Sequence, residues 1–112
     1  MKRNRQDTES GRRRNEDALF SAITSLQNVA ECRNFFRDLC TPAELQALVD
    51  RWHVVALLQQ DLPYRRIHDL TGVSVTTIGR VARFLSSGFG GYRTAIDRTS
   101  RPHTDRHKRA AR

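Results

Sequence analysis

Residues 64–85 read YRRIHDLTGVSVTTIGRVARFL and contain two amphipathic segments separated by a tight turn. Pro63 is placed to begin a short helix that runs through Leu70. Gly72 stops this helix, because glycine adopts the positive φ that such a turn commonly uses. Ser74 then supplies an N-cap hydroxyl for a second helix that reaches the end of the stretch. Two helices joined in this way predict a helix-turn-helix at about 64–85.

Apolar side chains recur on the inner faces of these two segments and are expected to lock the helices together; they are Ile67, Leu70, Val73, Ile78, Val81 and Leu85. One position departs from the usual pattern of the motif. His68 stands four residues before Gly72, where a small residue usually lets the helices approach. We expect its ring to tilt outward or to fill a small gap.

Polar side chains at spacings of three and four residues occupy the opposite face of the second segment. Arginine can bond both major-groove acceptors of guanine, and threonine can contact a base or a thymine methyl group. This stretch contains four arginines and one acidic residue, Asp69, and the excess of positive charge favours contacts with phosphates. We therefore expect the second helix to enter the major groove of double-stranded DNA. The predicted DNA-contacting residues are Tyr64, Arg65, Arg66, Ser74, Thr76, Thr77, Arg80 and Arg83. The alternative is that Arg80 and Arg83 only solvate an exposed helix face.

The rest of the chain also has helical periodicity and contains no convincing strand, so the predicted fold class is all-α. Helices are expected from Asn15 to about Gln27, from Asn28 to Leu39, from Thr41-Pro42 to about Leu58, and over Tyr92–Asp97. The third of these carries Leu45, Leu48, Val49, Trp52, Val55 and Ala56 inward, with Val54, Leu57 and Leu58 widening its apolar face. So much apolar surface in 112 residues predicts a shared core, and hence a homodimer.

Positive charge is concentrated at the two ends of the chain, which has a net charge of +8. Residues 1–14 carry six Lys or Arg against two acids, and residues 98–112 carry six against one. Both segments are poor in large apolar side chains, so we expect disordered basic tails flanking one domain over residues 15–97.

Several other classes of protein are not favoured. The chain has no apolar run long enough to span a membrane and no signal-peptide core, which predicts a cytoplasmic protein with reduced Cys32 and Cys40. No phosphate loop, nucleophile elbow or paired carboxylates follow a strand, so no enzyme is expected. His103 and His107 are four residues apart, which is the spacing of two metal ligands on one face of a helix. Because they lie in a segment expected to be a tail, we expect no metal site there.

The chain resembles the tryptophan repressor family in Thr41-Pro42-Ala43-Glu44, Arg51 and the stretch from Thr71 to Arg80. It is similar to the repressor-like YerC/YecD group in residues 35–41 and in the Gly-Gly-Tyr and Asp-Arg of residues 90–98. The resemblance covers about residues 15–97. It implies an intertwined homodimer whose N-terminal helices wrap the partner and hold two reading heads about one DNA turn apart.

The resemblance also implies an effector pocket, with Thr41, Arg51 and Arg80 as its candidate residues. Arginines matching Arg51 and Arg80 enclose the indole of tryptophan in that family. Glycine follows the second arginine there, whereas this chain has Val81, whose branched side chain occupies space that the indole needs. We therefore expect no tight tryptophan binding and no other cofactor.

The expected function is that of a sequence-specific DNA-binding transcriptional regulator, and by family resemblance a repressor. The alternative is a helical protein-interaction module whose basic tails bind nucleic acid without sequence preference.

Overall fold

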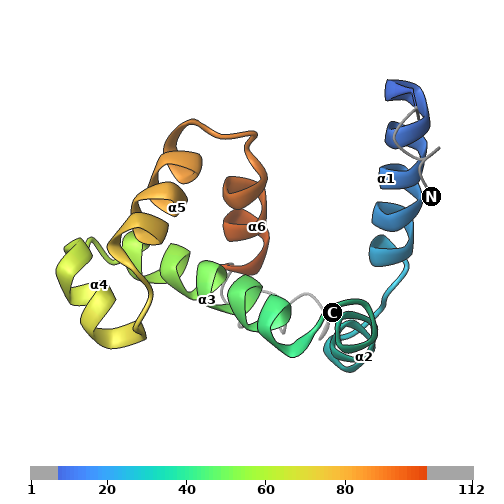
Figure 1. The fold of residues 1–112 in the computed structure, drawn as a ribbon. Coiled ribbons are helices and arrows are strands. Elements are labelled where there is room, and N and C mark those ends of the chain that lie inside the picture. The colour runs from blue at the N-terminus through green and yellow to red at the C-terminus, as the bar shows by residue number, and fades with distance from the viewer. Residues whose placement is uncertain (1–7, 101–112) are drawn as a thin grey trace, which may run out of the picture. The chain divides into compact units, whose positions relative to one another are not determined.

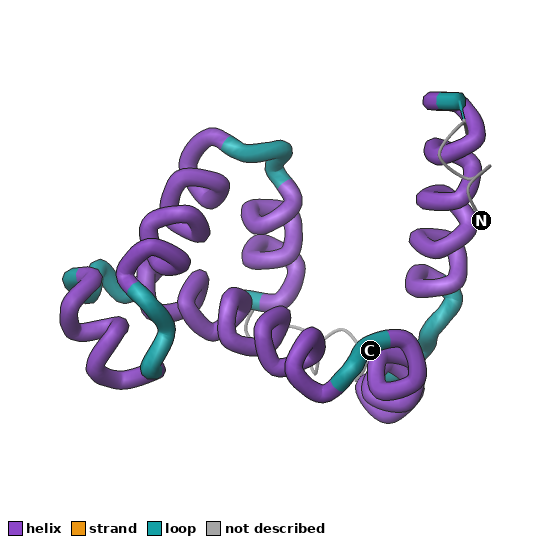
Figure 2. The backbone as a smooth tube through the Cα atoms, viewed as in Figure 1, coloured by secondary structure: helices purple, strands orange, loops and turns teal. Residues whose placement is uncertain are grey.

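The computed structural model describes residues 8–100, which form helices and no strand, so the all-α prediction is confirmed. The helices are α1 (Glu9–Thr24), α2 (Val29–Leu39), α3 (Pro42–Gln59), α4 (Tyr64–Thr71), α5 (Val75–Ser87) and α6 (Gly91–Thr99) (Figures 1 and 2). The chain divides into two compact units, Met1–Leu45 and Gln46–Arg112. None of the described helices is long and apolar enough to cross a membrane.

Helix α1 begins six residues before the predicted start at Asn15. Thr8 is its N-cap, and the Thr8 hydroxyl accepts a hydrogen bond from the backbone N–H of Gly11 at 3.0 Å. Glu9 lies in the first turn and pairs with Arg12 at 2.7 Å. The prediction of disorder through residue 14 is therefore wrong for residues 9–14, where a cap and charged helix-forming residues offset the lack of apolar side chains.

The other helix ends are predicted more closely. Helix α1 ends at Thr24 rather than Gln27, and α6 extends beyond the predicted Tyr92–Asp97 by one residue at its start and two at its end. The remainder of the two predicted tails, residues 1–7 and 101–112 with His103 and His107, lies outside the described residues.

Capping boxes form at the starts of α2 and α3. The Asn28 side chain accepts from the Glu31 N–H at 2.9 Å, while the Glu31 carboxylate accepts from the Gln27 N–H at 2.8 Å. At the start of α3, Thr41 and Glu44 exchange hydrogen bonds of 3.1 and 2.8 Å. These caps fix where α2 and α3 begin.

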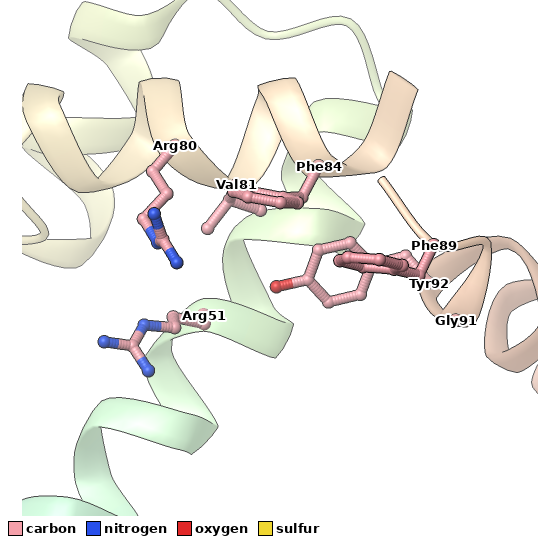
Figure 3. A pocket seen from close by; sticks show the side chains of 7 residues that line it. All are labelled: Arg51, Arg80, Val81, Phe84, Phe89, Gly91 and Tyr92. Atoms are coloured by element: carbon pink, nitrogen blue, oxygen red, sulfur yellow. The ribbon is translucent and has the colours of Figure 1, made fainter. Parts of the chain in front are cut away.

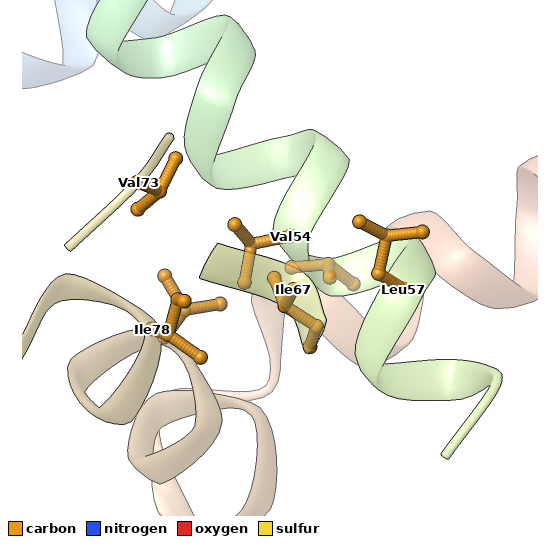
Figure 4. Close-up of a cluster of buried hydrophobic side chains, with 7 residues drawn as sticks. Val54, Leu57, Ile67, Val73 and Ile78 are labelled. Atoms are coloured by element: carbon orange, nitrogen blue, oxygen red, sulfur yellow. The ribbon is translucent and has the colours of Figure 1, made fainter. Parts of the chain in front are cut away.

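The hydrophobic core of the second unit joins the C-terminal half of α3 to α4, the turn and α5 (Figure 4). Its buried members are Val54, Val55, Leu57, Ile67, Val73, Ile78 and Val81. Partly buried side chains pack against it, including Leu85 of α5 and Tyr92 and Ile96 of α6. Four of the six residues expected to lock the helix-turn-helix are thus buried and Leu85 is half-buried.

Leu70 is the exception, because 51% of it is exposed. Thr71, four residues after Ile67, takes the inward position at the end of α4 instead. Its hydroxyl donates to the carbonyl of Ile67 at 2.7 Å and accepts from the Val73 N–H at 3.0 Å. The expectation that Leu70 would be buried is wrong because a polar residue closes this end of the helix.

Much of the remaining apolar surface is uncovered in the single chain. Helices α1 and α2 contain no buried residue. Large exposed side chains in the first unit are Phe20, Val29 and Leu39. In the second unit, α3 exposes Leu48, Val49 and Trp52, and Ala56 is exposed as well. The prediction that these α3 residues face inward is therefore wrong within one chain.

Candidate nucleic-acid interface

The turn between α4 and α5 is held by its own backbone and by the side chains of His68 and Thr71. Gly72 has φ 78°, the left-handed conformation expected from the sequence, and its N–H donates to the carbonyl of His68 at 2.8 Å. His68 is exposed, in keeping with the expectation that its ring tilts outward. Its Nδ1 lies 2.8 Å from the carbonyl oxygen of Val73, which can only accept a hydrogen bond. The turn therefore sets the position of α5 relative to α4.

Ser74 and Thr77 form the N-terminal cap of α5. The Ser74 hydroxyl oxygen accepts from the Thr77 N–H at 3.1 Å, and the two hydroxyl oxygens lie 3.1 Å apart within hydrogen-bond distance. Thr77 is half-buried, whereas Val75 and Thr76 are exposed. Of the two threonines predicted to read bases, Thr76 is the one with an open side chain, and Thr77 serves mainly as part of the cap.

Arg80 and Arg83 are both exposed on α5, and both contact the ring of Phe84. Their guanidinium carbons lie 4.7 and 5.3 Å from the ring centroid. Cation–π contacts of this kind restrict an arginine while leaving its donor groups open. Neither arginine forms an ion pair with a carboxylate among the described residues. Two oriented, unpaired cations thus lie on one side of α5.

Tyr64, Arg65 and Arg66 are exposed at the start of α4, as predicted. The ring of Tyr64 reaches α5, because its Cε2 lies 3.9 Å from the point where a side chain at Gly79 would begin. The structure thus places Tyr64 beside the middle of α5.

A cavity of about 460 Å³ has walls from α3, α5 and the start of α6 (Figure 3). It brings together Arg51 and Arg80, two of the three residues predicted for an effector pocket. Thr41, the third, belongs to the other unit and caps α3. The cavity is lined by Arg51, Arg80, Val81, Phe84, Phe89, Gly91 and Tyr92.

The aromatic part of this cavity is missed by the sequence analysis. Phe84, Phe89 and Tyr92 line it, and the Tyr92 ring also contacts Trp52 with centroids 6.2 Å apart. In Figure 3 the Tyr92 hydroxyl points toward the arginine side of the cavity. A signal was present in the sequence, since Phe89 is a large apolar residue between glycines, and it is fully exposed in the structure. Val81, the residue predicted to obstruct an indole, is only 2% exposed and forms part of the cavity wall.

The chain is similar to one protein family, one sequence relative and two proteins of known structure. The profile of the family described as Trp repressor protein matches residues 14–100. The chain is 42% identical over 89 residues to the uncharacterized protein YerC of Bacillus subtilis, covering 80% of this chain and 86% of YerC.

Two crystal structures are similar to this fold. A TrpR-like protein from Eubacterium eligens has a TM-score of 0.72 at 35% identity, covering 87% of this chain and 95% of its own. A candidate Trp repressor from Staphylococcus aureus has the same TM-score at 36% identity, covering 89% and 95%.

Proposed function

The chain belongs to the Trp repressor family, a family of DNA-binding regulators, and from this we propose that it represses transcription by reading a specific DNA sequence as a homodimer. The reading element is α5, which enters the major groove while α4 and the turn lie against the DNA backbone. The observation that carries the proposal is the pair of oriented, unpaired arginines on α5, Arg80 and Arg83.

The chemistry of this face suits a nucleic acid. An arginine held over Phe84 loses less freedom when it binds, and its planar fork matches the two acceptors on the major-groove edge of guanine. Thr76 presents a hydroxyl and a methyl group one turn before Arg80. Tyr64, Arg65 and Arg66 at the start of α4 are open for contacts with phosphates, which set the register of the complex.

The homodimer is supported by the apolar side chains that one chain leaves uncovered. No residue of α1 or α2 is buried, although α2 carries Cys32, Phe35 and Phe36 on one side and Leu39 is 52% exposed. A monomeric protein rarely leaves so many large apolar groups in water. A second copy would cover these groups, and twofold symmetry would then present two copies of α5 to a palindromic or near-palindromic site.

An amino-acid effector is not part of the proposal. The cavity between Arg51 and Arg80 has cations suited to a carboxylate, but Val81 stands in its wall. We therefore propose that DNA binding does not depend on tryptophan.

The test starts with selection of bound sequences from a random duplex pool, followed by affinities for the selected site and for a random duplex. Arg83→Ala and Thr76→Ala should each weaken the selected complex by about 1–3 kcal/mol and the random complex much less, so the specificity ratio falls. Arg93→Ala is the matched control, since it removes the same charge from an exposed position on α6. It should leave the ratio unchanged.

A protein-interaction module is the alternative function. Such a module would select no sequence from the pool, and its residual affinity for DNA would come from the ends of the chain alone. Failure to enrich any sequence would therefore overturn the proposal.

A further inference from the structure

Gly79 lies near the middle of α5, where glycine weakens a helix relative to alanine. Its backbone does not require glycine. The described glycines with positive φ are Gly72 and Gly90, and Gly79 is not among them. An alanine at position 79 would adopt the same helical backbone without strain.

Internal packing does not require glycine at this position either. A Cβ built on Gly79 would meet one atom within 4 Å, Cε2 of Tyr64 at 3.9 Å, which is an ordinary van der Waals contact. Gly88 is a useful contrast, because a Cβ there would overlap the carbonyl oxygen of Phe84. The folded chain thus explains the glycine at position 88 but not the one at position 79.

The position of Gly79 on α5 indicates what does explain it. Gly79 follows Thr76 by three residues and precedes Arg83 by four, so the three share one face of the helix. Val75, 51% exposed, lies one turn earlier on the adjoining side of that face. The side chains before Gly79 are therefore short. Short side chains reach the base edges of DNA only when the helix backbone itself comes close to them.

We propose that Gly79 is a specificity-determining position at which the backbone of α5 makes its closest approach to the base edges of the major groove. This inference rests on the proposed function, since it presumes that α5 is the reading helix. Because Gly79 has no side chain, the backbone of α5 can come close enough for Thr76 to contact bases directly. Arg83, one turn further along, has a longer side chain and reaches the bases from a greater distance. Glycine is a frequent choice where a backbone must approach a ligand closely.

The test is Gly79→Ala in the full-length chain, with thermal unfolding and DNA affinity measured on the same preparations. We expect the midpoint of unfolding to rise by about 2–6 °C, because alanine favours the helix. We expect affinity for the selected site to fall about tenfold or more, with affinity for a random duplex nearly unchanged. Thr94→Ala on α6 is the control: it also places alanine in a helix, at an exposed position outside α5, and should not change binding.

Two results would overturn the inference. If Gly79→Ala lowers stability, the glycine serves internal packing. If the variant binds the selected site as tightly as the parent while Arg83→Ala and Thr76→Ala lose specificity, α5 reads DNA without a close approach at position 79. If all three variants bind as the parent does, the proposed function itself fails.

Discussion

The imidazole of His68 donates a hydrogen bond of 2.8 Å from Nδ1 to the carbonyl oxygen of Val73, and so joins the last turn of α4 to the residue that leads into α5. Val73 is itself a buried core residue. His68 is larger than the residue that the motif usually has at this position. Its side chain does not disturb the packing but forms a hydrogen bond across the turn.

His68→Ala should lower the free energy of unfolding by about 0.5–1.5 kcal/mol, because the Val73 carbonyl loses its side-chain donor and the turn loses one connection. Urea unfolding at fixed protein concentration measures this change. His53→Ala is the control, since His53 is exposed on α3 and forms no side-chain hydrogen bond with a described residue. Equal midpoints for the two variants would show that the His68 bond contributes nothing to stability.

The proposed dimer should sediment at about twice 12.9 kDa and unfold with a midpoint that rises with protein concentration. Phe36 is half-buried in one chain, where its ring meets that of Phe35 edge-on at 5.5 Å. Phe36→Asp should prevent association, because burying an unpaired charge in the interface costs about 3 kcal/mol or more.

Asn34→Asp is the matched control for the dimer, since it adds the same charge to an exposed position on α2 and should remain dimeric. The buried core of the second unit does not include Phe36, so the Phe36→Asp chain should keep a folded helix-turn-helix. A parent chain that sediments as a stable monomer at micromolar concentration contradicts the prediction.

Deleting residues 1–7 and 101–112 should weaken binding to every duplex by a similar factor and flatten its dependence on salt. The deleted segments carry three bases and one acid, and five bases and one acid, so they contribute phosphate attraction without base contacts. The cap at Thr8 sets the first boundary, because a cut at residue 14 would remove part of α1. A deletion that abolishes sequence preference, while Thr76→Ala and Arg83→Ala leave it intact, would contradict this prediction.

Isothermal titration calorimetry with tryptophan should detect no micromolar complex. The family resemblance places an indole where this chain has Val81, which is buried in the core and lines the cavity beside Arg51 and Arg80, so we expect its branched side chain to obstruct the ring. A micromolar complex that disappears in Arg80→Ala would contradict this expectation and point to an amino-acid sensor.

The features predictable from the sequence are those in which a residue acts on neighbours three or four positions away. The Thr41 and Glu44 cap, the Ser74 cap and the left-handed Gly72 are of this kind, since the backbone groups they satisfy lie within one turn. Thr8 belongs to the same class, but it lies in a strongly polar segment whose composition indicated a tail.

Features set by tertiary packing were less predictable. The choice of Thr71 rather than Leu70 for the inner position depends on the angle at which α4 meets the core. The periodicity of α3 predicts that Trp52 packs against a neighbouring helix. It does not tell whether that helix belongs to the same chain or to a second copy, so it could not predict that Trp52 is exposed in one chain. Phe89 and Tyr92 line the cavity because the chain turns back after α5. The glycines after α5 predicted a break in the helix there, but not the direction in which the chain continues.

The uneven distribution of buried residues has a consequence for how such a regulator would respond in a cell. Within residues 8–100, the seven buried side chains lie between positions 54 and 81, and none lies in α1 or α2. If a second copy covers α1 and α2, the stable packing of these helices is coupled to dimerisation. At concentrations below the dimer dissociation constant, the amount of two-headed protein then rises with the square of the amount synthesised. Occupancy of an operator would change steeply with expression level, giving a threshold response that needs no small-molecule signal.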